Sequence, residues 1–128
     1  MSHIASPLTD LYAPIQAHLN QVVAIMDEEL RSDVPFVDGL SDHVKGFRGK
    51  MLRPALLLLT ADALGKVTKE HLTLAAVVEM VHLATLVHDD VLDEADMRRK
   101  QPTVNSMNGN EVAVMLGDYL ISHSFHLC

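Results

Sequence analysis

Apolar residues recur at helical spacing from Thr68 to Leu92, and this long run is the feature that most constrains the fold. An α-helix has about 3.6 residues per turn, so side chains three or four positions apart share one face. Thr68 is a suitable cap for its start. The pattern predicts one long amphipathic helix whose apolar face needs other helices to cover it. The residues that define this face are Leu72, Ala76, Val77, Met80, Leu83, Val87 and Leu92.

Four more helices are predicted around this one, and no segment shows the alternation of a strand. The first is capped by Asp10 and tolerates Pro14 in its first turn. The third has almost no polar face, which predicts a central position, and Gly65 ends it. The expected helices cover 10–30, 37–47, 54–64 and 110 onward, with a loop over 98–108. The chain is therefore expected to be all-α, with residues 1–128 in a single domain.

Three carboxylates lie at the end of the long helix, at Asp89, Asp90 and Asp93, and two arginines follow at Arg98 and Arg99. Asp89 and Asp93 are four positions apart, so they share one helix face. Paired carboxylates without histidine or cysteine partners suit a hard cation such as Mg²⁺. Arginine forks match the oxygens of a diphosphate, so the cluster predicts a metal-bridged diphosphate substrate. The alternative is a solvated acidic helix end.

His82 and Leu86 lie on the same stripe of the predicted helix as Asp89 and Asp93, within about 60° of one another. The helix dipole disfavours anions at this C-terminal end, and like charges in adjacent turns repel. A metal ion or the nearby arginines must therefore offset the two aspartates. A lone histidine such as His82 is more often a core residue than a ligand, so both interpretations stay open.

A second basic cluster, Gly49-Lys50-Met51-Leu52-Arg53-Pro54, flanks the predicted start of the third helix. Free backbone N–H groups and the helix dipole favour anions there, so two glycines and two or three cations suit a diphosphate cradle. The alternative is an ordinary solvated basic loop. Near the other end of the chain, His123, His126 and Cys128 imitate a soft-metal site, but we do not interpret them as one.

Composition excludes several classes of protein. A net charge of −7 argues against nucleic acid as a partner. No apolar stretch is expected to reach the roughly 18 residues that a membrane span requires. The first residues, 1–4, lack the features of a signal peptide, and the single cysteine excludes an intrachain disulfide. These features predict a cytoplasmic protein without a transmembrane segment.

These motifs together resemble those of the trans-type polyprenyl diphosphate synthases, in their N-terminal part only. The resemblance covers nearly all of the chain, and its aspartate motif is highly specific in this context. It implies an antiparallel helical bundle of the isoprenoid synthase type, of which this chain holds the N-terminal half. The segments that carry the resemblance, in the family's order, are 49–54, 79–93, Arg98-Arg99, 102–105 and 117–120.

The resemblance also implies roles for individual residues. Asp89 and Asp93 match the motif that binds Mg²⁺ bridging to the allylic diphosphate, and Arg98 matches an arginine that contacts that diphosphate. Asp90 belongs to the motif but faces elsewhere and acts indirectly. The residues that match the site for isopentenyl diphosphate are Lys50, Arg53, His82 and Arg99.

The reaction implied by the family is head-to-tail prenyl transfer. Metal and guanidinium groups stabilise the charge that develops on the leaving allylic diphosphate, and the cation then alkylates isopentenyl diphosphate. The hydrocarbon chain is expected to grow along the helix past Ala84 and Thr85. Small side chains at these positions predict a medium- or long-chain product.

The chain departs from the family pattern chiefly in what it lacks. Asp89-Asp90 is its only Asp-Asp pair, whereas the family uses a second aspartate-rich motif, so we expect the isolated chain to be inactive. Homodimerisation, or completion by a C-terminal half, is implied. Arg48 and Lys100 replace frequent glycines and are expected to add charge beside the diphosphate sites. Two other hypotheses stay open: a fragment of a class I terpene cyclase, and a noncatalytic helical subunit or interaction module.

Overall fold

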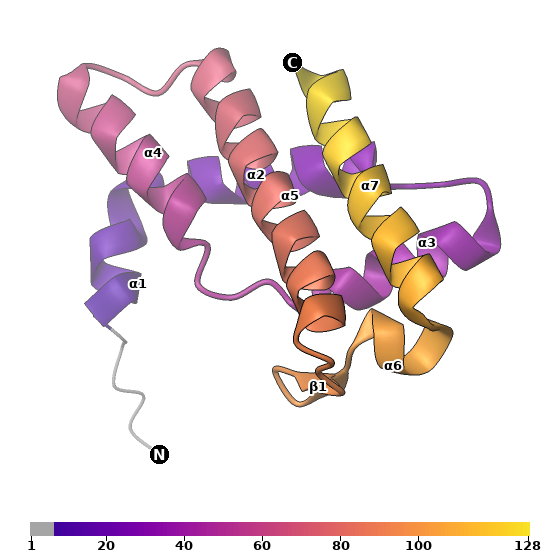
Figure 1. Ribbon diagram of the computed structural model, residues 1–128. Coiled ribbons are helices and arrows are strands. Elements are labelled where there is room, and N and C mark those ends of the chain that lie inside the picture. The colour runs from indigo at the N-terminus through magenta and orange to yellow at the C-terminus, as the bar shows by residue number, and fades with distance from the viewer. Residues whose placement is uncertain (1–6) are drawn as a thin grey trace.

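The computed structural model describes residues 7–128, and its centre is helix α5, Lys69–Leu92. Helices α2 (Gln16–Glu29), α4 (Leu52–Leu64) and α7 (Asn110–Leu127) pack against it (Figure 1). α5 and α7 lie side by side and run antiparallel (Figure 1). The predicted apolar face of α5 is largely confirmed, because Ala76, Met80, Leu83 and Val87 are all buried in the core. The predicted all-α fold is confirmed.

The start of the chain differs from the prediction of one helix beginning at Asp10. Helix α1 covers Pro7–Tyr12, a 3₁₀ turn (η1) covers Ala13–Ile15, and only then does α2 begin. The break falls at Pro14, which has no N–H to donate and clashes with the preceding helical turn. Asp10 therefore lies inside α1 and not at the start of α2. The apolar stripe of α2 is buried as predicted and consists of Leu19, Val22 and Met26.

Helix α4 lies at an edge of the described fold, so the prediction that it is central is wrong. One face of the helix buries Ala55, Leu58 and Ala61 against the core. Its opposite face leaves Leu56 68% exposed and Leu64 85% exposed. The sequence lacks a polar face here because leucines occupy both sides of the helix, and within residues 7–128 only one side is covered. Gly65 ends the helix as predicted.

Helix α3 (Pro35–Lys45) and the segment 97–108 complete the fold. The prediction of a loop over 98–108 is wrong, because this segment contains a two-stranded hairpin and a short helix. Strands β1 (Met97–Arg98) and β2 (Gln101–Pro102) pair antiparallel, and α6 covers Val104–Asn108. Strands of two residues are too short to show an alternating pattern, so sequence periodicity could not reveal them.

By length and apolar composition alone, α5 could cross a membrane, so the expectation that no such stretch exists is wrong. The core helix of a water-exposed bundle has the same composition. In this fold the apolar side chains of α5 pack against α2, α4 and α7. The helix also carries two buried acids, Glu79 and Asp90.

Candidate active site

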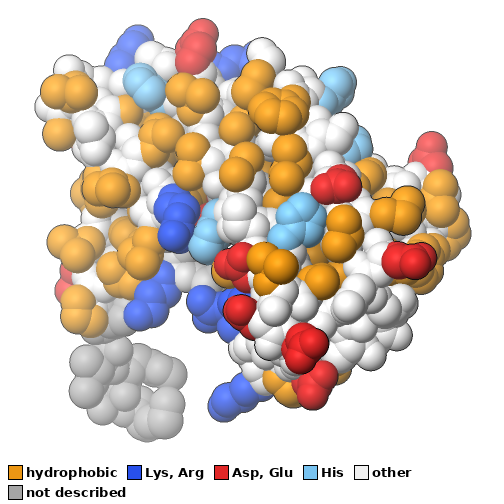
Figure 2. Space-filling view, in the orientation of Figure 1, with side chains coloured by type: hydrophobic (Ala, Val, Ile, Leu, Met, Phe, Trp, Pro, Cys, Tyr) orange, Lys and Arg blue, Asp and Glu red, His pale blue; other side chains and the backbone are white. Residues whose placement is uncertain are grey.

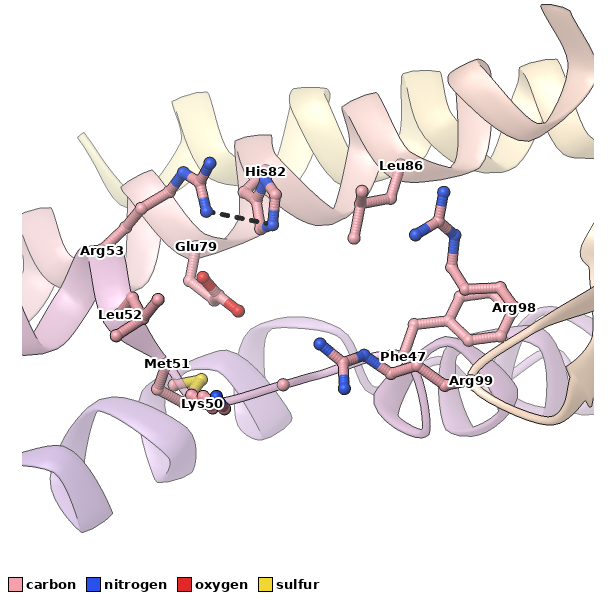
Figure 3. Close-up of a pocket in the computed structure, with 11 residues that line it drawn as sticks. Phe47, Lys50, Met51, Leu52, Arg53, Glu79, His82, Leu86, Arg98 and Arg99 are labelled. Carbon is pink, nitrogen blue, oxygen red and sulfur yellow. Dashed lines mark hydrogen bonds between the residues drawn. The ribbon is translucent and has the colours of Figure 1, made fainter. Parts of the chain in front are cut away.

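Five of the residues predicted to bind substrate line one pocket (Figure 3). Lys50 comes from the loop before α4 and Arg53 from the first turn of that helix. His82 comes from α5, and Arg98 and Arg99 come from the hairpin. On the surface, basic side chains border this hollow and acidic side chains lie beside it (Figure 2). The cavity of about 160 Å³ is smaller than a typical drug-sized site, so it suits a compact anionic headgroup.

Arg53 and His82 are hydrogen-bonded across the pocket, with Arg53 Nη1 3.2 Å from His82 Nε2 (Figure 3). Arginine can only donate, so His82 Nε2 accepts and the imidazole is neutral. Burial lowers the pKa of His82, and the positive charges of Arg53, Arg98 and Arg99 lower it further. His82 therefore orients Arg53 and does not add a charge to the pocket.

Glu79 is a pocket residue that sequence reasoning did not single out. It lies one turn before His82 on α5, is only 3% exposed, and points its carboxylate into the pocket (Figure 3). Burial raises the pKa of Glu79, and the charges of Arg53 and Arg48 oppose that rise. An acid within the apolar run of α5, three positions from His82, was the available signal.

Arg98 is held by Asp90 in a bidentate ion pair. Arg98 Nε lies 3.0 Å from Asp90 Oδ2, and Arg98 Nη2 lies 2.8 Å from Asp90 Oδ1. Asp90 is 2% exposed, and its hydrogen bonds raise the pKa of Arg98 against the effect of burial. Asp90 faces away from Asp89 and Asp93, as the sequence predicts. The structure adds that Asp90 fixes Arg98, one of the arginines that line the pocket.

The Pro102-Thr103-Val104-Asn105 segment fastens the hairpin to the end of α5. Asn105 Nδ2 donates to the carbonyls of Asp90 and Ala95, at 3.3 and 3.0 Å. Thr103 Oγ1 donates to the Ala95 carbonyl at 2.7 Å and accepts from the backbone N–H of Ser106. These bonds tie the segment after the hairpin to the residues at the end of α5, which carry Asp90.

Asp89 and Asp93 lie at the exposed C-terminal end of α5, beside the pocket but not in its lining. Among residues 7–128 neither carboxylate forms an ion pair, although both act on Arg98 through space. Two uncompensated carboxylates at the negative end of a helix dipole fit a divalent cation with oxygen ligands. These two residues could therefore hold a metal.

The two residues predicted to set product length are placed differently. Thr85 is exposed and lines a groove with Val77, Val78 and Val81, next to Arg53 and His82. Ala84 is fully buried in the core, because five positions before Asp89 is about 140° around the helix. Only Thr85 therefore lies on the surface along which a chain could extend from Asp89.

The expectation that Arg48 and Lys100 both add charge to the site is only partly met. Arg48 does not line the pocket and forms an ion pair with Asp27 of α2, although its charge still acts on Glu79. Lys100 is exposed at the tip of the hairpin and does not line the pocket. Glycine is required at position 49 for steric reasons, since a Cβ there would lie 2.1 Å from Arg99 Nη2. The missing side chain gives Arg99 its place in the pocket.

Left-handed backbone conformations gather around this site. The positive φ angles of non-glycine residues are 55° at Met51, 52° at Glu94, 49° at Arg99 and 64° at Lys100. Met51 and Arg99 line the pocket, and the other two flank it in sequence. Such conformations cost on the order of 1–2 kcal/mol each for non-glycine residues and concentrate at functional sites.

The described residues thus combine an all-α fold with a basic pocket beside an acidic helix end. Comparison with known proteins identifies the family. Residues 34–128 match the polyprenyl synthetase family, and the chain belongs to it. The resemblance found in the motifs is confirmed.

Two curated relatives illustrate the similarity. The all-trans-nonaprenyl-diphosphate synthase (geranyl-diphosphate specific) of Rhodobacter capsulatus is 42% identical over 119 residues, which cover 92% of this chain and 37% of the relative. The octaprenyl diphosphate synthase of Escherichia coli (strain K12) is 38% identical over 120 residues, covering 94% of this chain and 36% of the relative. The chain thus spans little more than a third of the length of these relatives.

Solved structures agree with this assignment. A decaprenyl diphosphate synthase from Rhodobacter capsulatus matches with a TM-score of 0.88 and 38% identity, over 94% of this chain and 38% of that one. A polyprenyl synthase from Caulobacter crescentus CB15, complexed with calcium and isoprenyl diphosphate, matches with a TM-score of 0.88 and 30% identity. That match covers 98% of this chain and 38% of the other.

Proposed function

We propose that this chain forms one wall of the active site of a polyprenyl diphosphate synthase. The reaction would condense isopentenyl diphosphate with an allylic diphosphate into a medium- or long-chain polyprenyl diphosphate. One observation carries the proposal: Lys50, Arg53 and Arg99 meet in a single pocket with the Asp90-bound Arg98. Beside it lie Asp89 and Asp93, which form no ion pair among residues 7–128. With Arg98, four cations line this one small pocket, and arginine forks match the oxygens of a diphosphate.

In this proposal the two substrates occupy the two ends of the site. Lys50, Arg53 and Arg99 hold the diphosphate of isopentenyl diphosphate, with Arg53 kept in place by neutral His82. Arg98 faces the allylic diphosphate from the opposite side. Asp89 and Asp93 would hold Mg²⁺, which, when bound, neutralises charge on the leaving diphosphate. The fixed guanidiniums supply preorganised charge without further rearrangement.

The groove formed by Val77, Val78, Val81 and Thr85 gives the growing hydrocarbon a place to lie. Its three valines are apolar, and Thr85 is small enough to leave space next to the pocket. This supports the proposal of a medium- or long-chain product. A class I cyclase needs no second diphosphate, so the three cations at Lys50, Arg53 and Arg99 favour prenyl transfer.

The experiment that tests the proposal measures binding and turnover on the 128-residue chain. Isothermal titration calorimetry with isopentenyl diphosphate should show binding that Arg53→Ala weakens. Lys100→Ala is the matched control, because it removes a cation of the same neighbourhood that lies outside the pocket. Equal affinities for wild type, Arg53→Ala and Lys100→Ala would contradict the proposed site.

Turnover is followed on the same sample with labelled isopentenyl diphosphate, an allylic diphosphate and Mg²⁺. We expect diphosphate binding without elongation, because residues 7–128 show one acidic motif and about a third of the length of the relatives. Elongation by the chain alone would show that copies of it complete the site. Addition of a C-terminal segment of a relative should then be unnecessary for activity.

A further inference from the structure

The C-terminal turn of α2 carries three consecutive acids, Asp27, Glu28 and Glu29, and no basic residue. The helix dipole is negative at this end, so anions there are unfavourable unless cations offset them. Asp27 pairs with Arg48 and Lys45, and Glu28 pairs with Arg31 at 3.2 Å. Glu29 differs from both of them, because its partners in the described chain are two imidazoles.

His123 and His126 of α7 converge on a single oxygen of Glu29. His123 Nδ1 lies 2.6 Å and His126 Nδ1 2.9 Å from Glu29 Oε2. The two histidines are three positions apart, so they share one face of α7. The ring of Tyr119 packs on His123, with ring centroids 4.3 Å apart, and limits its rotation. All three donor groups lie within 4.8 Å of one another.

Two imidazoles and one carboxylate are the ligand set of borderline transition-metal ions and not of Mg²⁺. We propose that Glu29, His123 and His126 bind a divalent ion of the Zn²⁺ type, which ties the end of α7 to the end of α2. Bond lengths of about 2.0–2.2 Å place tetrahedral donors about 3.3 Å apart, so the side chains must spread slightly on binding. His126 has that freedom, since its side chain is 77% exposed.

Burial of the carboxylate raises the pKa of Glu29, but hydrogen bonds and charge from His123 and His126 outweigh that effect and lower it overall. Glu29 would act as a ligand in its carboxylate form. Its side chain is only 12% exposed, so little water competes for it. An ion held by these three groups would keep one tetrahedral position for water.

The third ligand is not the one that sequence proximity suggests. Cys128 Sγ is turned to the Ser124 carbonyl, at 3.6 Å, and does not join the histidines. Glu29 replaces it across 94 residues of sequence, a separation that no local motif can reveal. The site is also remote from Asp89 and Asp93, since α7 begins beside α6 and ends at the opposite side of the molecule (Figure 1).

The test is titration of the 128-residue chain with Zn²⁺ by calorimetry, in excess Mg²⁺ to saturate oxygen-only sites. One equivalent should bind to wild type and to the controls His18→Gln and Cys128→Ser. Groups outside the ligand shell already contribute about 10–100-fold to metal affinity, so His126→Ala, at an exposed position, should weaken binding at least about 100-fold. Glu29→Gln should act similarly, and circular dichroism checks that each variant is folded.

A second measurement separates a metal site from a proton-linked contact. Bound Zn²⁺ should raise the Tm of wild type and leave that of folded His126→Ala unchanged. Co²⁺ should give the visible bands of a tetrahedral ion in wild type only. Wild-type affinity in His126→Ala, or no Zn²⁺ binding by wild type, would overturn the proposal and leave the cluster as a hydrogen-bonded helix contact.

Discussion

The basic and acidic sides of the active site differ in how far the protein has already arranged them. On the basic side Arg98 is clamped by Asp90, Arg53 is bonded to His82, and Arg99 fills the space left by Gly49. On the acidic side Asp89 and Asp93 are exposed and have no ion-pair partner in residues 7–128. The fold therefore preorganises the groups proposed to hold diphosphate, whereas the proposed metal ligands would be organised only when a cation binds.

The largest effect is expected on exchanging Asp90 for alanine, because it leaves the Arg98 guanidinium without its buried partner. Breaking a buried ion pair from one side costs about 3–5 kcal/mol, so Asp90→Ala should lower the free energy of unfolding by about that amount. Urea denaturation followed by circular dichroism measures it. Asp89→Ala, one residue away and exposed, should change it by no more than about 0.5 kcal/mol. Equal losses of unfolding free energy in Asp90→Ala and Asp89→Ala would show that the ion pair with Arg98 does not stabilise the fold.

The substitution Gly49→Ala should weaken substrate binding without lowering the stability of the fold. The added Cβ would meet the far end of the Arg99 side chain, which can swing aside at low cost, so the fold should persist. Arg99 would then leave the pocket, and affinity for isopentenyl diphosphate should fall about tenfold, or about 1.4 kcal/mol. Calorimetry measures the affinity and denaturation the stability. An unchanged affinity would show that Arg99 does not hold the diphosphate.

Sequence reasoning predicted the parts of this molecule that depend on local pattern. The long periodicity of α5 and the glycine at the end of α4 were enough to place those helices. The prediction of one helix through Pro14 was wrong. The helix was expected to tolerate this proline near its first turn, but in the structure the helix is interrupted there. The exposed face of α4 could not be foreseen, since an all-leucine surface is the same whether or not a partner covers it.

Within the candidate site, the residues that line the pocket could be named by resemblance, whereas those that hold them in place could not. Lys50, Arg53, His82, Arg98 and Arg99 do meet in one pocket. The bidentate grip of Asp90 on Arg98 depends on the hairpin and on the bonds of Asn105, which are tertiary features. Glu79 was overlooked, although an acid within the apolar run of α5 was a signal that its carboxylate is buried.

A substitution at Lys100, at the tip of the hairpin, tests whether the backbone beside the pocket is strained. Lys100 has a φ of 64° and a side chain outside the pocket, so glycine should adopt the same backbone more easily. Lys100→Gly should stabilise the protein by about 1 kcal/mol, with affinity for isopentenyl diphosphate unchanged. Lys100→Ala removes the same charge but keeps the strain, and it should give no such gain in urea denaturation. A gain in both variants would point to charge repulsion among the arginines instead.

The smallest effect concerns pH, and it asks whether His82 is neutral in the folded pocket. The ordinary pKa of histidine is 6.5, and burial beside Arg53, Arg98 and Arg99 lowers the pKa of His82. Above pH 6.5 both folded and unfolded states are neutral, so its contribution to stability is complete. As the pH falls below 6.5, the unfolded chain binds a proton that the folded chain does not, and stability is lost until the lowered pKa is passed. Glu79 acts in the opposite direction, because its pKa is raised above 4.5.

The comparison is therefore made in a Glu79→Gln background, which removes that opposing titration. There, the unfolding free energy of a chain with His82 should decline as the pH falls below 6.5, relative to His82→Gln, which does not titrate. Parallel curves for the two chains would mean that the pKa of His82 is the same folded and unfolded. The pocket would then not impose the neutral form that lets Nε2 accept from Arg53, and Arg53 would need another group to hold it.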